Sequence, residues 1–237
     1  MYKYLLLFSK TESVRWLGHL DILRTFERAI RRADLPIVFS TGFNPREKIT
    51  FVSALGVGIT GSREPMTIEL NENLDPTIII NKLNTVLPAG IIMVECYLLQ
   101  ENEAKELSKL LTQAEFTLVC QHPDYTFQQI SSAIDSVLSE TTLTITRQKE
   151  GSTRTQDIRP NLFHLECLPE EHTSDRMTLR MIVGQGETGT VRPVEVATAL
   201  NSVLNGITPR RAHRLRLLTS DGFTPPLPLK LDRTEIA

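Results

Sequence analysis

The stretch from His19 to Lys48 reads HLDILRTFERAIRRADLPIVFSTGFNPREK, and it predicts a helix, a strand and a turn in succession. Apolar residues recur at helical spacing over 18–34, which is typical of an amphipathic helix. Pro36 ends this helix, because a proline disfavours helical backbone at the residue before it. The apolar segment 37–41 predicts a strand, and the sequence GFNP that follows it predicts a turn.

The elements around this stretch give the first hundred residues the order strand–helix–strand–strand–helix–strand. Asp75 followed by Pro76 marks the start of the second helix, because aspartate caps helices and proline favours their first position. The predicted strands cover 2–9, 37–41, 65–70 and 91–99, the predicted helices cover 18–34 and 76–87, and a short strand or loop arm covers 48–52.

A similar order returns in the second half of the chain. Strands are predicted over 114–120, 141–149, 161–168, 176–183 and 212–218, and helices over 126–139 and 192–205. We therefore expect an α+β fold made of two tandem ferredoxin-like βαββαβ domains with antiparallel sheets. The expected domains cover 1–100 and 114–220, with a connector over 101–113 and an extended, proline-rich tail over 221–237.

Composition fits an ordinary globular protein, with 41% hydrophobic and 23% charged residues. No apolar run approaches the ~18 residues of a membrane span, and we expect a cytoplasmic protein without membrane contact. The three cysteines, Cys96, Cys120 and Cys167, are widely separated in apolar segments. This spacing predicts buried thiols rather than disulfides, and no iron–sulfur cluster held by this chain.

Positive charge is concentrated near the N-terminus, although the net charge is −2. Residues 1–60 hold nine Lys or Arg and five Asp or Glu, residues 61–150 hold six and thirteen, and residues 151–237 hold eleven and ten. A basic N-terminal module beside an acidic middle predicts an anionic partner that binds at one place.

Arginines form a stripe along the helix predicted over 18–34. At 100° per residue the stripe lies opposite the apolar face and consists of Arg24, Arg28, Arg31 and Arg32. Guanidinium groups grip phosphates bidentately, so this face is a candidate RNA-binding surface. The alternative is a solvated face on which Asp21 and Glu27 neutralise part of the charge.

The turn after the helix is a second candidate for RNA binding. Gly42 permits unusual backbone angles and Pro45 stiffens the exit. The turn would present Phe43 beside Asn44, Arg46 and Lys48. An aromatic ring beside cations suits stacking on an unpaired base together with phosphate binding. The alternative is a tight turn whose phenylalanine caps the core.

Two further groups are weaker candidates. His19 lies near the helix N-terminus on its apolar side, where a neutral imidazole could act as a general base, or could simply be a hydrogen-bonded residue at the core edge. Arg214 and Arg216 share one face of the last predicted strand and could extend an anion-binding surface, or could blunt a sheet edge. No zinc spacing, nucleophile elbow or paired-carboxylate signature is present, so no cofactor and no metal is predicted.

The segment VRWLGHLDILRTFERAIRRA, followed by GFNPREKITFVSALGVG, resembles the bacterial radical SAM-linked family of unknown function. The resemblance is strongest over about residues 2–70, and the later segment DIRP and the arginine-rich last strand also fit. It implies an accessory role to a radical S-adenosylmethionine enzyme, which must then be a partner chain. The matched positions are His19, Asp21, Arg24, Arg28, Gly42, Phe43, Asn44, Pro45 and Lys48.

These observations favour an RNA-interacting accessory protein without catalytic activity of its own, holding tRNA or rRNA for a partner modifying enzyme. Two alternatives stay open. One is an RNA-cleaving protein with His19 as general base, since the repeated domain order is similar to that of the tandem ferredoxin-like RNA endonucleases of CRISPR systems. The other is a protein-interaction module that binds no RNA.

Overall fold

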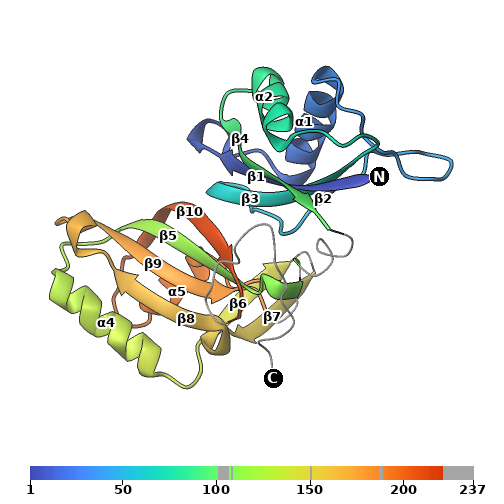
Figure 1. Ribbon diagram of the computed structural model, residues 1–237. Helices are drawn as coiled ribbons and strands as arrows, with labels where there is room; N and C mark the ends of the chain where they lie inside the picture. The colour runs from blue at the N-terminus through green and yellow to red at the C-terminus, as the bar shows by residue number, and fades with distance from the viewer. Residues whose placement is uncertain (101–106, 108, 150, 187–188, 221–237) are drawn as a thin grey trace, which may run out of the picture. The chain divides into compact units, whose positions relative to one another are not determined.

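The computed structural model describes residues 1–100, 107, 109–149, 151–186 and 189–220. The chain is a mixed α+β protein with mostly antiparallel sheets, and it divides into two compact units (Figure 1). The first comprises Met1–Leu111 and the chain from Leu218 onward, and the second comprises Thr112–Leu217. The expected tail over 221–237 lies outside the described residues, as does most of the connector over 101–113. Within the described part of the chain, no helix is long and apolar enough to cross a membrane.

The elements of the first unit up to residue 99 are strands and helices. They are β1 (Tyr2–Lys10), the short helix η1 (Glu12–Val14), α1 (His19–Arg32), β2 (Ile49–Phe51), β3 (Ile59–Leu70), α2 (Pro76–Val86) and β4 (Ile91–Leu99). The strands lie in the order β4-β1-β3-β2, and every neighbouring pair is antiparallel. Both helices cover the same face of this sheet (Figure 1).

Strand β1 has buried residues on both faces because it lies in the middle of this sheet. Tyr4, Leu6 and Phe8 point to the helices and join the core under α1 and α2. Leu5 and Leu7 point to the other face and pack with Leu99 and Leu107, among other residues. This burial explains why the strand reads as a continuous apolar run rather than as an alternation.

The two helices of the first unit form as the sequence predicts. In α1, Ile22, Phe26, Ala29 and Ile30 are buried, so the apolar face assigned from periodicity is confirmed. At its start, the Asp21 carboxylate accepts a hydrogen bond from the Gly18 N–H at 3.1 Å. The cap on α2 is also confirmed, because the Asp75 carboxylate accepts the Thr77 N–H at 2.8 Å.

The predicted strand over 37–41 is wrong. This segment makes only two isolated bridges, Ile37 to Leu70 and Phe39 to Glu47. The Ile37 N–H donates instead to the nearby Leu35 carbonyl at 2.7 Å, so it is not available for a regular ladder. The second strand of the sheet is β2, within the segment 48–52 for which the sequence predicted a short strand or loop arm.

The second unit contains a four-stranded sheet and a separate two-stranded ribbon. Its elements are β5 (Gln113–Gln121), α4 (Phe127–Ser139), β6 (Thr144–Lys149), β7 (Ser152–Asp157), η2 (Arg159–Asn161), β8 (Leu162–Cys167), η3 (Pro169–Glu171), β9 (Arg176–Gly184), α5 (Pro193–Leu200) and β10 (Thr208–Leu218). The sheet order is β10-β5-β9-β8, while β6 and β7 pair with each other. Helix α4 packs on β8 and α5 packs on β5.

The hairpin β6–β7 corrects the prediction for the second half. The segment 141–149 does contain a strand, but that strand belongs to the hairpin and not to the main sheet. Its partner, STRTQD, is polar and half-exposed or exposed, so it carries no burial signal. Gly151, with φ of +76°, lies between the two strands in a conformation that glycine adopts without strain. The sequence expectation missed β7 for this reason.

Two polar side chains define where elements of the second unit end. The Asn201 side chain bonds both the N–H and the C=O of Ile207, at 2.8 Å each, and α5 ends at Leu200 rather than at 205 as predicted. The Arg159 guanidinium donates to the Leu138 carbonyl at 2.7 Å, near the end of α4. The DIRP segment, residues 157–160, is therefore a structural junction between elements of this unit.

Candidate nucleic-acid interface

The exposed face of α1 carries two arginines that have no partner among the residues that the structure describes. Arg24 and Arg28 lie one helical turn apart and opposite the buried residues of the helix, and both are exposed. Neither side chain has a hydrogen bond or ion pair within the described part of the chain. Two neighbouring guanidinium groups that are not neutralised locally can bind an anion without first breaking an internal contact.

The other two arginines of the predicted stripe have structural partners. Arg31 forms an ion pair with Glu47, whose side chain is buried. Arg32 donates to the Val86 carbonyl at the end of α2, at 2.7 Å. The stripe is therefore divided: Arg31 and Arg32 connect α1 to neighbouring segments, whereas Arg24 and Arg28 make no such contact within the described part of the chain.

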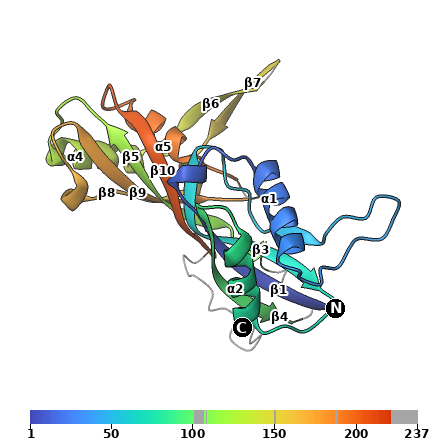
Figure 2. The same cartoon turned by 90° about the horizontal axis from the view of Figure 1, so that it is seen from above.

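The GFNP turn forms a loop over residues 40–46 that extends away from the rest of the first unit (Figure 2). Its base is closed by two hydrogen bonds, from the Ser40 N–H to the Arg46 carbonyl at 2.8 Å and from the Arg46 N–H to the Ser40 hydroxyl at 3.0 Å. Phe43 at the tip is fully exposed, so the alternative that it caps the core is wrong. Asn44 and Arg46 are exposed beside it.

Lys48 and the base of this loop take part in ion pairs. Lys48 bonds the Glu69 carboxylate at 2.7 Å, and Lys3 approaches the same carboxylate at 3.3 Å. The partner of Arg31, Glu47, follows the loop directly. These contacts connect the last turn of α1 to the base of the loop, so the two predicted RNA-binding segments are neighbours in the first unit.

His19 lies at the start of α1 and is exposed. Its ring contacts the edge of Phe51, with 5.0 Å between ring centroids. It also lines a cavity of about 20 Å³, enough for one water molecule, together with Lys10, Glu64 and Ser53 among other residues. This grouping could not be predicted from the sequence, because Lys10 and Glu64 are far apart in the chain.

Lys10 is 2% exposed, and its ammonium group donates to the carbonyls of Arg15 and Leu17 at 2.9 and 2.8 Å. Burial lowers the pKa of Lys10, and the negative charge of Glu64 partly offsets this effect. The lysine therefore fixes the segment that leads into α1. A basic residue at the end of an apolar strand was the only sequence signal for this role.

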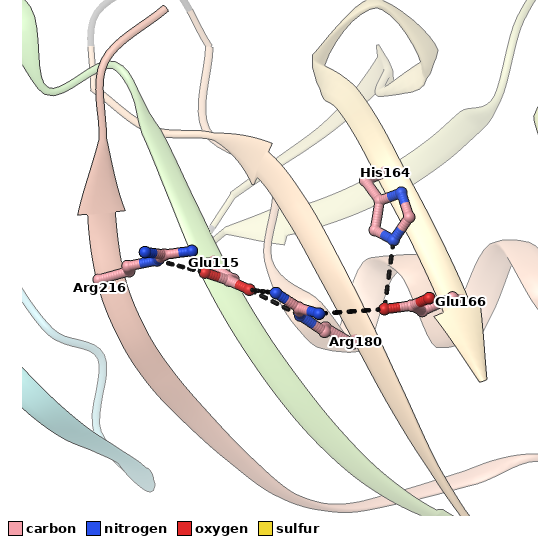
Figure 3. A network of polar contacts seen from close by, with 5 residues as sticks. All are labelled: Glu115, His164, Glu166, Arg180 and Arg216. Carbon is pink, nitrogen blue, oxygen red and sulfur yellow. Dashed lines mark hydrogen bonds and ion pairs between the residues drawn. The ribbon is translucent and has the colours of Figure 1, made fainter. Parts of the chain in front are cut away.

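The predicted basic pair on the last strand has a different setting. Arg214 is buried, and its guanidinium lies 6.0 Å from the centre of the Phe116 ring. Arg216 donates to Glu115 at 2.5 Å, and Arg180 donates to the same carboxylate at 2.6 Å. Figure 3 shows that this row continues through Glu166 to His164, so that it crosses β10, β5, β9 and β8.

Charge in this row is largely balanced. Burial would raise the pKa of Glu115, but hydrogen bonds from Arg216 and Arg180 outweigh it and leave the pKa below the ordinary value. In turn, the hydrogen bond that Arg180 donates to the Glu115 carboxylate is the main reason that the pKa of Arg180 is raised. Arg216 is therefore paired with Glu115 within the sheet, and an anion would have to compete with this carboxylate for it. This makes the row a weaker anion site than the face of α1.

These features define an α+β protein with an exposed, positively charged helix face. The chain belongs to the DUF2344 family, described as an uncharacterized protein conserved in bacteria, whose model matches residues 3–193. No curated protein matches the chain significantly in sequence.

Three solved structures share the fold at low sequence identity. A chain of a Cbf5–Nop10–Gar1 complex is 12% identical with a TM-score of 0.53, and the match covers 92% of this chain and 50% of that chain. A chain of an H/ACA RNP bound to a substrate RNA containing 2′-deoxyuridine is 13% identical with a TM-score of 0.53, and the match covers 92% of this chain and 49% of that chain. A chain of an archaeal box H/ACA sRNP Nop10–Cbf5 complex is 13% identical with a TM-score of 0.51, and the match covers 91% of this chain and 47% of that chain. The chain thus spans about half the length of these similar chains.

Proposed function

We propose that this protein binds RNA through Arg24, Arg28, Phe43, Asn44 and Arg46, which we call the basic surface, and assists a partner enzyme that modifies the RNA. The observation that carries the proposal is the pair Arg24 and Arg28, exposed on one face of α1 and without partners among the described residues. Arginine binds phosphate through paired N–H groups, and such contacts supply most of the non-specific affinity for nucleic acid.

The loop over 40–46 adds a contact of another kind. Phe43 is fully exposed on a loop closed by two hydrogen bonds, and a solvent-exposed phenylalanine contributes little to the stability of a monomer. An aromatic ring held beside cations suits an unpaired base, which can stack on it while the phosphates contact arginine. This combination favours RNA with single-stranded segments, such as the loops of tRNA or rRNA.

The architecture supports the same proposal. We propose that the two units are ferredoxin-like βαββαβ domains, the second with β6–β7 inserted, and the strand orders β4-β1-β3-β2 and β10-β5-β9-β8 support this assignment. Two of the similar solved chains come from H/ACA ribonucleoprotein structures, and one of these is bound to a substrate RNA. Fold likeness alone does not carry function, so the weight of the proposal rests on the basic surface.

The accessory role rests on the resemblance of residues 2–70 to the radical SAM-linked family. The three cysteines of this chain are buried and separate, so any iron–sulfur cluster would belong to a partner chain. We propose that this protein presents the RNA and that the partner performs the chemistry.

A salt series with labelled, unfractionated tRNA and rRNA fragments tests RNA binding. For the wild type, the logarithm of the affinity should fall linearly with the logarithm of salt concentration. In the Arg24→Gln/Arg28→Gln variant the slope should be smaller by about 1.4 to 1.8, which corresponds to two lost phosphate contacts. As a control, Arg154→Gln/Arg176→Gln removes the same charge from the second unit and should leave the slope within about 0.5 of the wild type. Absence of binding at low salt would refute the RNA proposal and favour a protein-interaction module.

One observation favours RNA cleavage as a second candidate. The exposed His19 shares a small cavity with buried Lys10 and Glu64, so an imidazole lies near two ionisable groups. If His19 were a general base, the wild type would cleave RNA without added metal, and His19→Ala would abolish cleavage while the protein stays folded. Cleavage that persists in the variant would exclude this role.

A further inference from the structure

Trp16 is the single tryptophan of the chain, and 67% of it is exposed. Tryptophan is highly buried on average, so an exposed ring of this size calls for an explanation. It lies between η1 and α1, three residues before His19. It is not among the site residues that charge and turn patterns predict from the sequence.

The backbone around Trp16 is firmly held although its ring is not buried. The Arg15 carbonyl accepts hydrogen bonds from the Lys10 ammonium at 2.9 Å and from the Gly58 N–H at 2.8 Å. The Leu17 carbonyl accepts a second bond from Lys10 at 2.8 Å. A buried lysine thus anchors the residues on both sides of Trp16. Such anchoring reduces the entropy that a ligand contact would cost.

Gly58 allows the ring to lie close to the neighbouring loop. Its φ of +81° favours glycine, and a Cβ atom at this position would stand 3.2 Å from the Trp16 ring. The loop backbone therefore supports one part of the ring while most of the residue faces solvent. The position of the ring is defined by its surroundings and is not that of a free side chain.

A cation accompanies the ring. The Arg15 guanidinium carbon lies 4.5 Å from the centre of the Trp16 ring, and Arg15 is also paired with Glu12. An arginine against a tryptophan ring forms a combined platform that can stack on a base and attract phosphate. Because Arg15 is paired with Glu12, the positive charge that would attract a polyanion to this end of α1 comes from the exposed Arg24 and Arg28 on the same helix.

We propose that Trp16 and Arg15 stack on an unpaired nucleobase of the RNA that contacts α1. This inference rests on the proposed RNA binding and specifies the ligand as single-stranded RNA at this end of the helix. Bases within a duplex are already stacked on their neighbours, so they cannot use the platform without unpairing. Phe43 and Trp16 would then hold two different bases of one RNA.

The single tryptophan makes the test direct. Wild-type fluorescence and the anisotropy of a labelled RNA are followed in the same titration, with a single strand and with a blunt duplex of the same composition. For the single strand, Trp16 fluorescence should be quenched with the midpoint that anisotropy gives, and for the duplex it should change little. Trp16→Ala should weaken binding of the single strand about fivefold or more, whereas Trp16→Phe should keep affinity within about threefold of the wild type.

The control is Phe163→Ala, which removes a half-exposed aromatic ring from β8 in the second unit and should leave the affinity unchanged. Circular dichroism establishes that each variant is folded. If anisotropy reports binding while Trp16 fluorescence and the Trp16→Ala affinity stay unchanged, the stacking proposal is overturned and RNA binding stands. If anisotropy reports no binding of either RNA, both proposals are overturned.

Discussion

Glu115 holds three strands of the second unit together, and its replacement by glutamine should cost substantial stability. The carboxylate is 1% exposed and accepts hydrogen bonds from Arg216 on β10 and Arg180 on β9, at 2.5 and 2.6 Å. Breaking a fully buried ion pair costs roughly 3–5 kcal/mol. The two arginine side chains are 46% and 41% exposed, so water can solvate them again, and glutamine keeps one acceptor oxygen. We therefore expect a loss of about 2 kcal/mol at neutral pH.

Thermal unfolding followed by circular dichroism measures this loss. For a chain of this size about 2 kcal/mol corresponds to a decrease in melting temperature of roughly 4–8 °C. The matched control is Glu166→Gln at the other end of the same row, where a half-exposed carboxylate lies 3.4 Å from Arg180. This control should change stability by less than about 0.5 kcal/mol. Equal losses in the two variants, or no loss in Glu115→Gln, would refute the reasoning.

The pH dependence follows from the same contacts. The pKa of Glu115 in the folded protein is below the ordinary value of 4.5, so the unfolded chain takes up the proton first. Its contribution to stability is present above pH 4.5 and is lost as the pH falls through the lowered pKa. The difference in stability between wild type and Glu115→Gln should therefore shrink below pH 4.5. A difference that stays constant down to pH 3 would contradict the assignment.

Three further predictions follow from other parts of the chain. Burial raises the pKa of Cys96 and Cys120 to about 12 and that of Cys167 to about 11. Ellman's reagent at pH 8 should therefore label the folded protein at least about 100-fold more slowly than the denatured protein. Comparable labelling rates would show that the thiols are accessible. Burial and the neighbouring His172 imidazole lower the pKa of His122 below 6.5, so the stability that neutral His122 contributes above pH 6.5 should be lost as the pH falls through the lowered pKa. In thermal unfolding between pH 7.5 and 5, the melting temperature of His122→Gln should therefore depend less on pH than that of the wild type. An equally steep dependence in the variant would exclude this cause. Phe43→Ala should leave the melting temperature unchanged and weaken RNA binding about fivefold or more in anisotropy titrations; an unchanged affinity would remove the loop tip from the proposed interface.

The parts of the fold that depend on local patterns could be predicted from the sequence. Strand β4 occupies residues 91–99 as expected, because its apolar run is bounded by a proline–glycine break. Helix α1 buries the face that its periodicity assigns, and α2 begins at the Asp75 cap. In each case the signal lies within a few residues of the element that it specifies.

The parts that depend on distant partners could not be predicted. Strand β7 is polar, and only its pairing with β6 identifies it as a strand. Segment 37–41 is apolar and β-branched, yet its hydrogen bonds go to a local carbonyl and to isolated bridges. For both segments the sequence near the element does not determine its partner.

The same limit applies to the candidate site. The arginines of α1 are equivalent in sequence, but Arg31 pairs with Glu47 and Arg32 with the end of α2, while Arg24 and Arg28 have no partner among the described residues. Charge patterning places all four arginines on one helix face, and it cannot distinguish those with structural contacts from the two that have none among the described residues. Trp16 lay within the family-like segment, and its exposure was the missing information.

Ultraviolet crosslinking of RNA to this protein in living cells, followed by mass spectrometry of the crosslinked peptides, tests RNA binding at the basic surface most directly. Aromatic side chains that stack on bases should carry crosslinked nucleotides, so we expect them in peptides from residues 11–48, which include Trp16 and Phe43. Crosslinks confined to residues 112–217, or no crosslinked RNA at all, would contradict the account.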